Sequence, residues 1–235
     1  MINILCRKVT LGLAATALVV GFNTSAVTIY DNSVNDLATR FDPGLLEIGD
    51  EIILANSERY LTSFAFEYWA LNNGTEIGTL DIGVRVRFYL NDGPEFNGYA
   101  TPGTTFFDTD WLDSFISTPT NRATLNFDQS DFAAGWLGGP ASLMPVTSNF
   151  TWSVQFRNMD VDDTVGVDLF NPPIVGQAIN DYWEYNGTSW SLMTNTVPMN
   201  FAARFDAVVP EPSVAVLAVL GGLGAFLFGR RYRKA

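Results

Sequence analysis

Ile82-Gly-Val-Arg-Val-Arg-Phe-Tyr-Leu90 is the stretch of sequence that decides the fold. Its apolar residues stand at every second position, while Gly83, Arg85, Arg87 and Tyr89 stand between them. Successive side chains of a β-strand point to opposite faces, so a period of two is typical of a strand with one buried face. The pattern therefore predicts a strand over residues 82–90.

The same alternation recurs on both sides of this strand. It predicts further strands at 52–55, 60–71, 122–127, 150–157, 165–170 and 201–205. Turn-forming residues separate the strands at 72–74, 91–94, 101–103, 138–140 and 171–173. About nine or ten strands without a long amphipathic helix indicate an all-β fold. We expect an antiparallel β-sandwich with jelly-roll-like connections, formed by residues 27–208 as a single domain.

A hairpin signal lies near the end of this domain. Asn186-Gly187 stands between two aromatic-rich segments, 181–185 and 188–192, which predicts a β-hairpin. The hairpin gathers four large aromatic residues, Tyr182, Trp183, Tyr185 and Trp190. If their rings emerge at the sheet surface, they could stack on sugar rings of a polysaccharide. In the alternative, the two tryptophans fill the sandwich core and the tyrosines lie half-buried beside them.

The absence of two residue types limits the chemistry. The chain has no histidine, and its one cysteine, Cys6, lies near the N-terminus. These facts exclude a Ser-His-Asp triad, a Cys-His dyad and ordinary zinc or copper sites in the body of the protein. A carboxylate glycosidase remains conceivable, with members drawn from Glu67, Glu95 and Glu184. Since 25 acidic residues make such pairs easy to find, we expect a protein that is not an enzyme.

Calcium is the metal for which the sequence offers ligands, because hard cations prefer clustered oxygen donors. One acidic cluster consists of Asp160, Asp162, Asp163 and the nearby Asp168. A second consists of Asp108, Asp110 and Asp113. The first departs from the EF-hand pattern because Val165 stands where a glycine is needed. The alternative is that both clusters are exposed acidic turns, in which case no cofactor is bound.

Residues 1–26 have the features of a secretory signal peptide. Arg7 and Lys8 form a basic start, residues 9–22 are apolar, and Thr24-Ser-Ala26 supplies small residues for signal peptidase. Cleavage after Ala26 would also remove Cys6. The exported body then contains no disulfide and relies on packing for its stability.

The last 27 residues have three parts. Val209-Pro-Glu-Pro-Ser213 is followed by an uncharged apolar run over 214–228 and by the basic cluster 230–234. We expect a transmembrane helix over about 213–229, with the cations on the cytoplasmic side. The uncharged run has 15 residues, which is short of the ~20 residues that usually cross a membrane. Such a span is suited to a temporary anchor.

The order of these parts resembles the PEP-CTERM sorting signal, and the resemblance is confined to about residues 208–235. It implies that an exosortase-like enzyme in the membrane of a Gram-negative-type bacterium recognises and processes the tail. The residues that carry the resemblance are Pro210, Glu211 and Pro212 of the motif, with Arg230 and Arg231 of the basic cluster. The resemblance further implies transient anchoring in the inner membrane and a final place at the cell surface or in the extracellular matrix. An ordinary single-span anchor after a proline linker is the alternative.

The charge of the exported body limits its partners. From Asp31 to Glu211 the chain has seven arginines, no lysine and 25 acidic residues, which gives a net charge of −18. A surface of this sign disfavours nucleic acid, whose phosphates require cations. We expect an exported structural or adhesive protein associated with extracellular polysaccharide. A carbohydrate-binding module is the second possibility, and a carboxylate-dependent glycosidase is the third.

Overall fold

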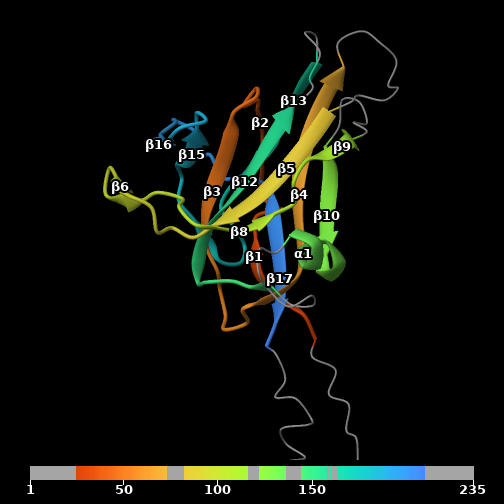
Figure 1. The fold of residues 1–235 in the computed structure, drawn as a ribbon, viewed down its shortest axis with the longest axis vertical. Helices are drawn as coiled ribbons and strands as arrows, with labels where there is room; N and C mark the ends of the chain where they lie inside the picture. The colour runs from red at the N-terminus through yellow and green to blue at the C-terminus, as the bar shows by residue number, and fades with distance from the viewer. Residues whose placement is uncertain are drawn as a thin grey trace, which may run out of the picture.

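The structure is a computed structural model that describes residues 25–72, 82–115, 122–135, 144–157, 159 and 163–209. Strands make up most of the described elements, and the pairings between them are antiparallel. The predicted all-β fold is confirmed. Figure 1 shows the elements along the long axis of the molecule.

Seven of the described strands form one sheet, here called sheet A. Its main path runs β1-β17-β4-β13-β2, and β10 and β11 pair with β4. Their bounds are β1 (Val27–Asp31), β2 (Asp36–Phe41), β4 (Tyr60–Asn72), β10 (Ala123–Asp128), β11 (Met144–Pro145), β13 (Asp163–Phe170) and β17 (Ala203–Val208). The first and last of the described strands are therefore neighbours in the sheet.

Eight described strands form the opposing sheet, sheet B, with a main path of β16-β15-β3-β12-β5-β8. β14 pairs with β3, and β9 pairs with β5. Their bounds are β3 (Glu47–Ile53), β5 (Ile82–Tyr89), β8 (Thr105–Asp108), β9 (Leu112–Phe115), β12 (Asn149–Arg157), β14 (Gln177–Ala178), β15 (Tyr182–Tyr185) and β16 (Trp190–Met193). Strands β6 (Glu95–Phe96) and β7 (Tyr99–Ala100) form a small separate hairpin, and α1 covers Gln129–Gly135.

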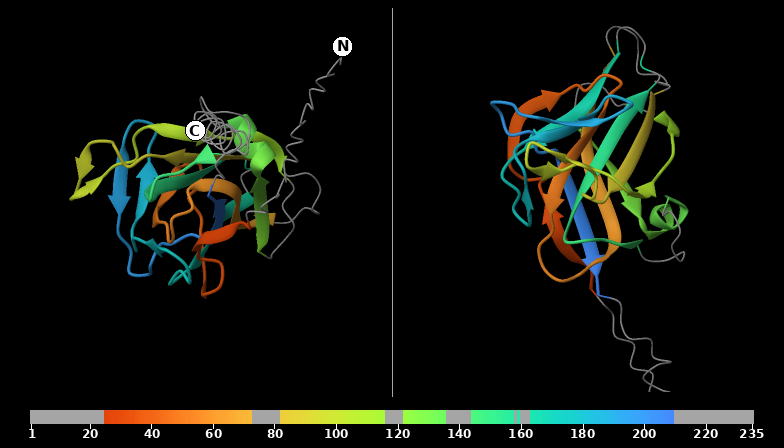
Figure 2. Two further views of the ribbon diagram at one scale, coloured as in Figure 1. Left: turned by 90° about the horizontal axis from the view of Figure 1, so that it is seen from below. Right: turned by 60° about the vertical axis from the view of Figure 1, so that its left-hand side comes forward.

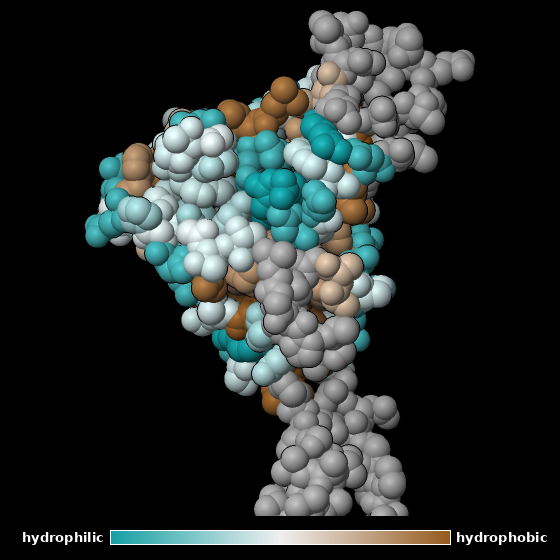
Figure 3. Space-filling model, in the orientation of Figure 1, coloured by the Kyte–Doolittle hydropathy of each residue, from teal (hydrophilic) through white to brown (hydrophobic). Residues whose placement is uncertain are grey.

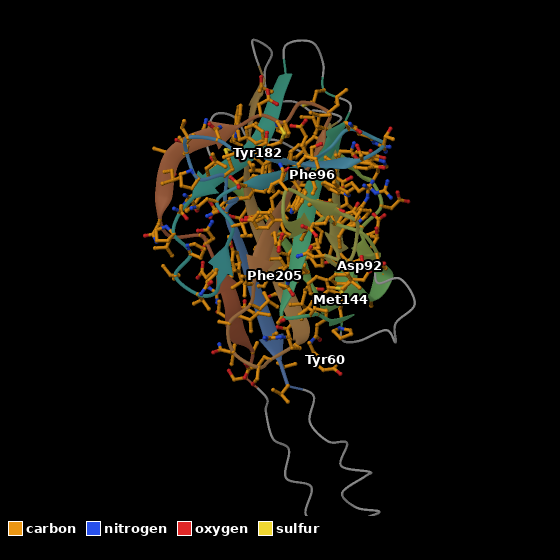
Figure 4. All side chains as sticks on the ribbon, turned by 90° about the vertical axis from the view of Figure 1, so that its left-hand side faces the viewer. Tyr60, Asp92, Phe96, Met144, Tyr182 and Phe205 are labelled. Atoms are coloured by element: carbon orange, nitrogen blue, oxygen red, sulfur yellow. The ribbon has the colours of Figure 1, made fainter. Side chains whose placement is uncertain are left out.

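The core lies between the two sheets, which Figure 2 shows from two further directions. Phe64 of β4 joins them, since its ring centroid lies 5.3 Å from Phe88 of β5 and 5.3 Å from Trp152 of β12. Phe205 of β17 lies 4.5 Å from Phe64 and occupies the interior in Figure 4. Aromatic pairs at such distances add to the stabilisation from buried apolar area. Packing of large rings thus holds together a sandwich whose sequence has no cysteine after Cys6.

The strand predicted at 82–90 is β5, which pairs with β12 on one side and with β8 and β9 on the other. Its apolar residues Ile82, Val84, Val86 and Phe88 are buried in the core, as the alternation predicts. The strand predicted at 52–55 differs more from the observed strand, because β3 begins at Glu47 and ends at Ile53. Glu47 and Asp50 are buried in that strand, and polar residues at buried positions conceal a strand from a search for apolar periodicity.

Asp50 is an acid with no exposed surface, 0% by relative area. The backbone N–H of Phe201 donates a hydrogen bond to its Oδ2 at 3.0 Å, while Oδ1 has no hydrogen-bond partner among the described residues. Burial raises the pKa of Asp50 well above its ordinary value. The hydrogen bond from Phe201 lowers this pKa, and the charge of Glu51 raises it further. A charged Asp50 is therefore costly to the folded state.

We expect Asp50→Asn to remove a pH dependence of stability. The folded wild type binds a proton that the unfolded chain has lost, so its free energy of unfolding falls as pH rises from about 4 toward the raised pKa. This contribution changes by at most about 1.4 kcal/mol per pH unit. Urea unfolding of the full chain at a series of pH values, followed by tryptophan fluorescence, should show the variant gaining stability relative to the wild type as pH rises. A difference that does not change with pH would contradict the expectation.

Candidate functional site

A buried acid organises the outer face of sheet B. Glu47 is 1% exposed, and its Oε1 accepts hydrogen bonds from the hydroxyls of Tyr89 at 2.8 Å and Ser153 at 2.6 Å. Its Oε2 accepts a hydrogen bond from the guanidinium of Arg87. A guanidinium N–H and two hydroxyls from two strands, β5 and β12, thus converge on one carboxylate of β3, which is how a buried charge is stabilised.

This group extends along β5 and β8. The Nε of Arg87 lies 3.5 Å from Asp108 Oδ2, and the Nε of Arg85 donates to Asp108 Oδ1 at 2.8 Å. Burial opposes ionisation of Asp108, but the bonds from Arg85 and from the backbone of Asp110 outweigh it and lower its pKa. We call the six residues the Glu47 network: Glu47, Arg85, Arg87, Tyr89, Asp108 and Ser153. Figure 3 shows hydrophilic side chains over β5 and β8 on this face.

The Glu47 network supports an aromatic pair. The ring of Tyr89 lies 5.3 Å from Trp190, which lies 5.0 Å from Tyr185. Tyr185 is also the cross-strand partner of Glu47. Both Tyr185 and Trp190 are half-buried, so part of each ring faces solvent. Two adjacent, positioned rings of this kind can hold the apolar face of a sugar.

The other two aromatic residues of the predicted sugar site are buried. The β15–β16 hairpin is confirmed, with Tyr185 paired to Trp190. Tyr182 contacts Phe41 at 5.0 Å on the inner face of the sandwich, and burial, with the charge of Glu184, raises its pKa to about 12. Trp183 is 0% exposed and contacts Phe96 of β6 at 6.4 Å. Neither ring presents a face to solvent.

The structure describes part of the two predicted calcium clusters. Asp160 and Asp162 lie outside the described residues, Asp163 begins β13, and Asp168 lies 3.5 Å from the guanidinium of Arg40. In the second cluster, arginines neutralise two acids. Asp108 binds Arg85, as above, and both oxygens of Asp113 lie 2.6 Å from a nitrogen of Arg157. Among the described residues, no three acids, histidines or cysteines form a group that could hold a metal ion, and calcium binding stays a prediction.

The three glutamates considered for a glycosidase lie in three different sheets. Glu67 is on β4 of sheet A, Glu95 is exposed on β6, and Glu184 is on β15 of sheet B. Glu67 is largely buried, and its Oε2 lies 2.6 Å from the Nε of Arg122. Burial raises the pKa of Glu67 even though the charge of Arg122 opposes the rise. The three carboxyl groups thus belong to three separate sheets, and the absence of enzymatic activity stays a prediction.

A pocket on the outer face of sheet A was not predicted. It has a volume of about 720 Å³ and is lined by Asp36, Ala38, Thr39, Arg40, Arg122 and Asp168. We call it the β2 pocket, since four of these residues belong to β2. The sequence of residues 31–44 is polar and turn-rich, and it predicts an entry strand plus a loop without a pocket. The alternating pattern does place Asp168 and Arg122 among the polar positions of their strands. It cannot show that β2 and the start of β10 lie beside Asp168 of β13.

Comparison of the chain with models of protein families, with curated proteins and with solved structures finds no match. Over the ranges that the structure describes, no helix has the length and apolar character needed to cross a membrane. The sorting residues Pro210, Glu211, Pro212, Arg230 and Arg231 lie outside those ranges, as do the predicted helix at 213–229 and residues 1–24 of the predicted signal peptide.

Proposed function

We propose that this chain is an exported structural or adhesive protein of the cell surface or extracellular matrix, associated with extracellular polysaccharide. Signal peptidase removes residues 1–26, and an exosortase-like membrane enzyme processes the tail 209–235. The Pro210-Glu211-Pro212 motif, the helix over about 213–229 and the basic cluster 230–234 are the sequence features behind this proposal. The described sandwich is the cargo, and its chain repeatedly crosses between the sheets, which supports a jelly-roll-like description.

The observation that carries the proposal is the pairing of the first and last strands. Val27 of β1 lies opposite Ala207 of β17, so the chain enters and leaves the sandwich at one pole (Figure 1). Val208 also pairs with Tyr60, which Figure 4 shows at this pole, with Phe96 and Tyr182 toward the other end. A signal peptide and a sorting tail attached to neighbouring strands would face the same membrane. The hairpin β15–β16 would then face away from it.

The surface chemistry of the body agrees with a place outside the cell. The strongly acidic, lysine-free stretch from Asp31 to Glu211 keeps copies soluble and apart, and it disfavours binding to nucleic acid. No cysteine follows Cys6, so an oxidising compartment cannot cross-link the sandwich wrongly.

Glu211→Gln tests the sorting step. Because the carboxylate between two prolines is the charged element of the motif, we expect the variant to remain almost entirely as a full-length membrane form. Glu95→Gln, at an exposed position of β6, is the matched control and should mature normally. Membrane fractionation followed by mass spectrometry of the C-terminal peptide measures the outcome. Normal processing of Glu211→Gln would count against an exosortase-like enzyme and favour an ordinary anchor.

A carbohydrate-binding module is the second candidate function. The observation that favours it is the half-buried pair Tyr185 and Trp190, whose ring centroids lie 5.0 Å apart. The ring of Tyr89 contacts Trp190 and supports the pair. Since Tyr182 and Trp183 are buried, the platform consists of two rings. A platform of this size would contact a short segment of a glycan chain and is compatible with an adhesive role.

A further inference from the structure

The β2 pocket lies at a defect in the edge of sheet A. Leu169 of β13 faces Thr39, whereas the next residue, Phe170, faces Asp36. Two extra residues of β2 therefore bulge out of the ladder, and one of them, Ala38, has a φ of 50°. The carboxylate of Asp36 accepts a hydrogen bond from the backbone N–H of Ala38 at 2.7 Å. Bulges redirect side chains at the edges of sheets, and a strained non-glycine residue in a pocket wall points to a functional constraint.

Two arginines in the pocket are held in fixed positions. The guanidinium of Arg40 lies over the ring of Trp69 at 5.4 Å, and that of Arg122 lies over Phe170 at 5.1 Å. Arg122 also bridges two acids, with Glu67 at 2.6 Å and Asp36 at 3.3 Å. Each guanidinium has five N–H donors in one plane, so the two groups give the pocket positioned donors.

The pocket also contains an unusual acceptor. Asp168 is 5% exposed, and its Oδ2 has no hydrogen-bond partner among the described residues. Its other oxygen, Oδ1, lies 3.5 Å from the Nε of Arg40. A buried carboxylate oxygen without a donor is unfavourable to the folded state. Asp168 lines the pocket, so its carboxylate is the acceptor that the pocket offers to a hydroxyl donor.

The charges of the pocket select among ligand classes. Three acids, Asp36, Glu67 and Asp168, face two arginines, Arg40 and Arg122. An excess of one negative charge disfavours an anionic ligand, and the guanidinium groups beside the carboxylates disfavour a metal ion. A neutral hydroxyl group fits both kinds of side chain, because it donates to a carboxylate and accepts from a guanidinium. Adjacent hydroxyls on a ring would use both at once.

We propose that the β2 pocket binds a neutral sugar residue of an extracellular polysaccharide. Asp168 accepts hydrogen bonds from its hydroxyl groups, while Arg40 and Arg122 donate to its oxygens. A volume of about 720 Å³ is in the range of small-molecule sites. This inference rests on the proposed association with extracellular polysaccharide and assigns it to sheet A, on the face opposite to the aromatic pair of sheet B.

Binding of the full chain to immobilised polysaccharides tests the proposal. The chain is kept in a detergent without a sugar headgroup, and the probes are dextran, mannan and galactan, with polygalacturonate as an acidic comparison. We expect binding to at least one neutral polysaccharide, weakened about tenfold or more by Asp168→Asn and by Arg122→Met. The matched controls are Asp113→Asn and Arg157→Met, which alter an exposed aspartate–arginine pair of sheet B whose arginine also lies over a ring, that of Trp111. Both controls should bind like the wild type.

Four results would overturn the assignment. They are no binding of the wild type to any neutral polysaccharide, preference for polygalacturonate, equal losses in the controls, and loss in Trp190→Ala with full binding in Asp168→Asn. Near-ultraviolet circular dichroism checks folding, and Arg122→Met at its exposed position carries the test if Asp168→Asn does not fold. C-terminal mass spectrometry of the chain isolated from exporting cells measures the sorting step separately. Correct processing without sugar binding would contradict the pocket and the polysaccharide association but not the proposed sorting.

Discussion

Replacement of Glu47 by alanine is expected to lower the free energy of unfolding by about 3–5 kcal/mol. The change removes the acceptor for Arg87, Tyr89 and Ser153 together. The side chain of Arg87 is only 14% exposed. Without Glu47, the one acid left beside its guanidinium is Asp108. An uncompensated charge in a largely dry site is the source of most of this loss. Urea unfolding of the full chain, followed by tryptophan fluorescence, measures it.

Two further variants separate the buried charge from the loss of a side chain. Asp113→Ala breaks an ion pair at an exposed site and should cost less than about 1 kcal/mol. The double variant Glu47→Leu with Arg87→Met replaces both charges by apolar groups, and it should recover much of the lost stability. If Glu47→Ala costs no more than Asp113→Ala, the Glu47 network does not stabilise sheet B. If the double variant is as unstable as Glu47→Ala, packing rather than charge is responsible.

The same residues show why the sequence predicts only part of the fold. Alternation identifies β5 and β12 because their inner positions are uniformly apolar. It misses the first half of β3, where Glu47 and Asp50 are buried although they are acids. Glu47 depends on Arg87, 40 residues away, and Ser153, 106 residues away, while Asp50 accepts a bond from Phe201, 151 residues away. A local pattern contains no information about such partners.

In the candidate sites too, local sequence patterns predict single elements but not the contacts between distant residues. The Asn186-Gly187 signal predicts the hairpin, and the hairpin brings Tyr185 and Trp190 together. The burial of Trp183 depends on Phe96 of the distant β6, which no local pattern places above it. The β2 pocket requires a bulge in β2 and the convergence of Arg40, Arg122 and Asp168 from three parts of the chain. In the sequence, Arg40 and Arg122 look like ordinary exposed charges, and Asp168 belongs to the predicted calcium cluster.

Phe64→Ala is expected to have an effect of similar or larger size, about 3–5 kcal/mol. The ring of Phe64 lies within 5.9 Å of five others, and it joins sheet A to sheet B. Those neighbours are Phe66, Phe88, Phe127, Trp152 and Phe205. Truncation would leave a cavity between strands that are each fixed by their own ladder, so the site cannot collapse easily. Since domains are stable by only about 5–15 kcal/mol, the variant should unfold at a much lower urea concentration.

Two substitutions serve as controls for Phe64→Ala, one conservative change at the same position and one at an exposed position. Phe64→Leu fills much of the same volume and should cost clearly less than alanine, whereas Tyr99→Ala, at a position that is 41% exposed, should cost less than about 0.5 kcal/mol. Because Phe64 links the sheets, its loss should weaken the β2 pocket on one face and the Tyr185–Trp190 pair on the other together. A Phe64→Ala protein that loses tryptophan fluorescence in two separate transitions would show that the sheets unfold independently. A single transition at lower urea, with both faces lost at once, follows if the aromatic core makes them one cooperative unit.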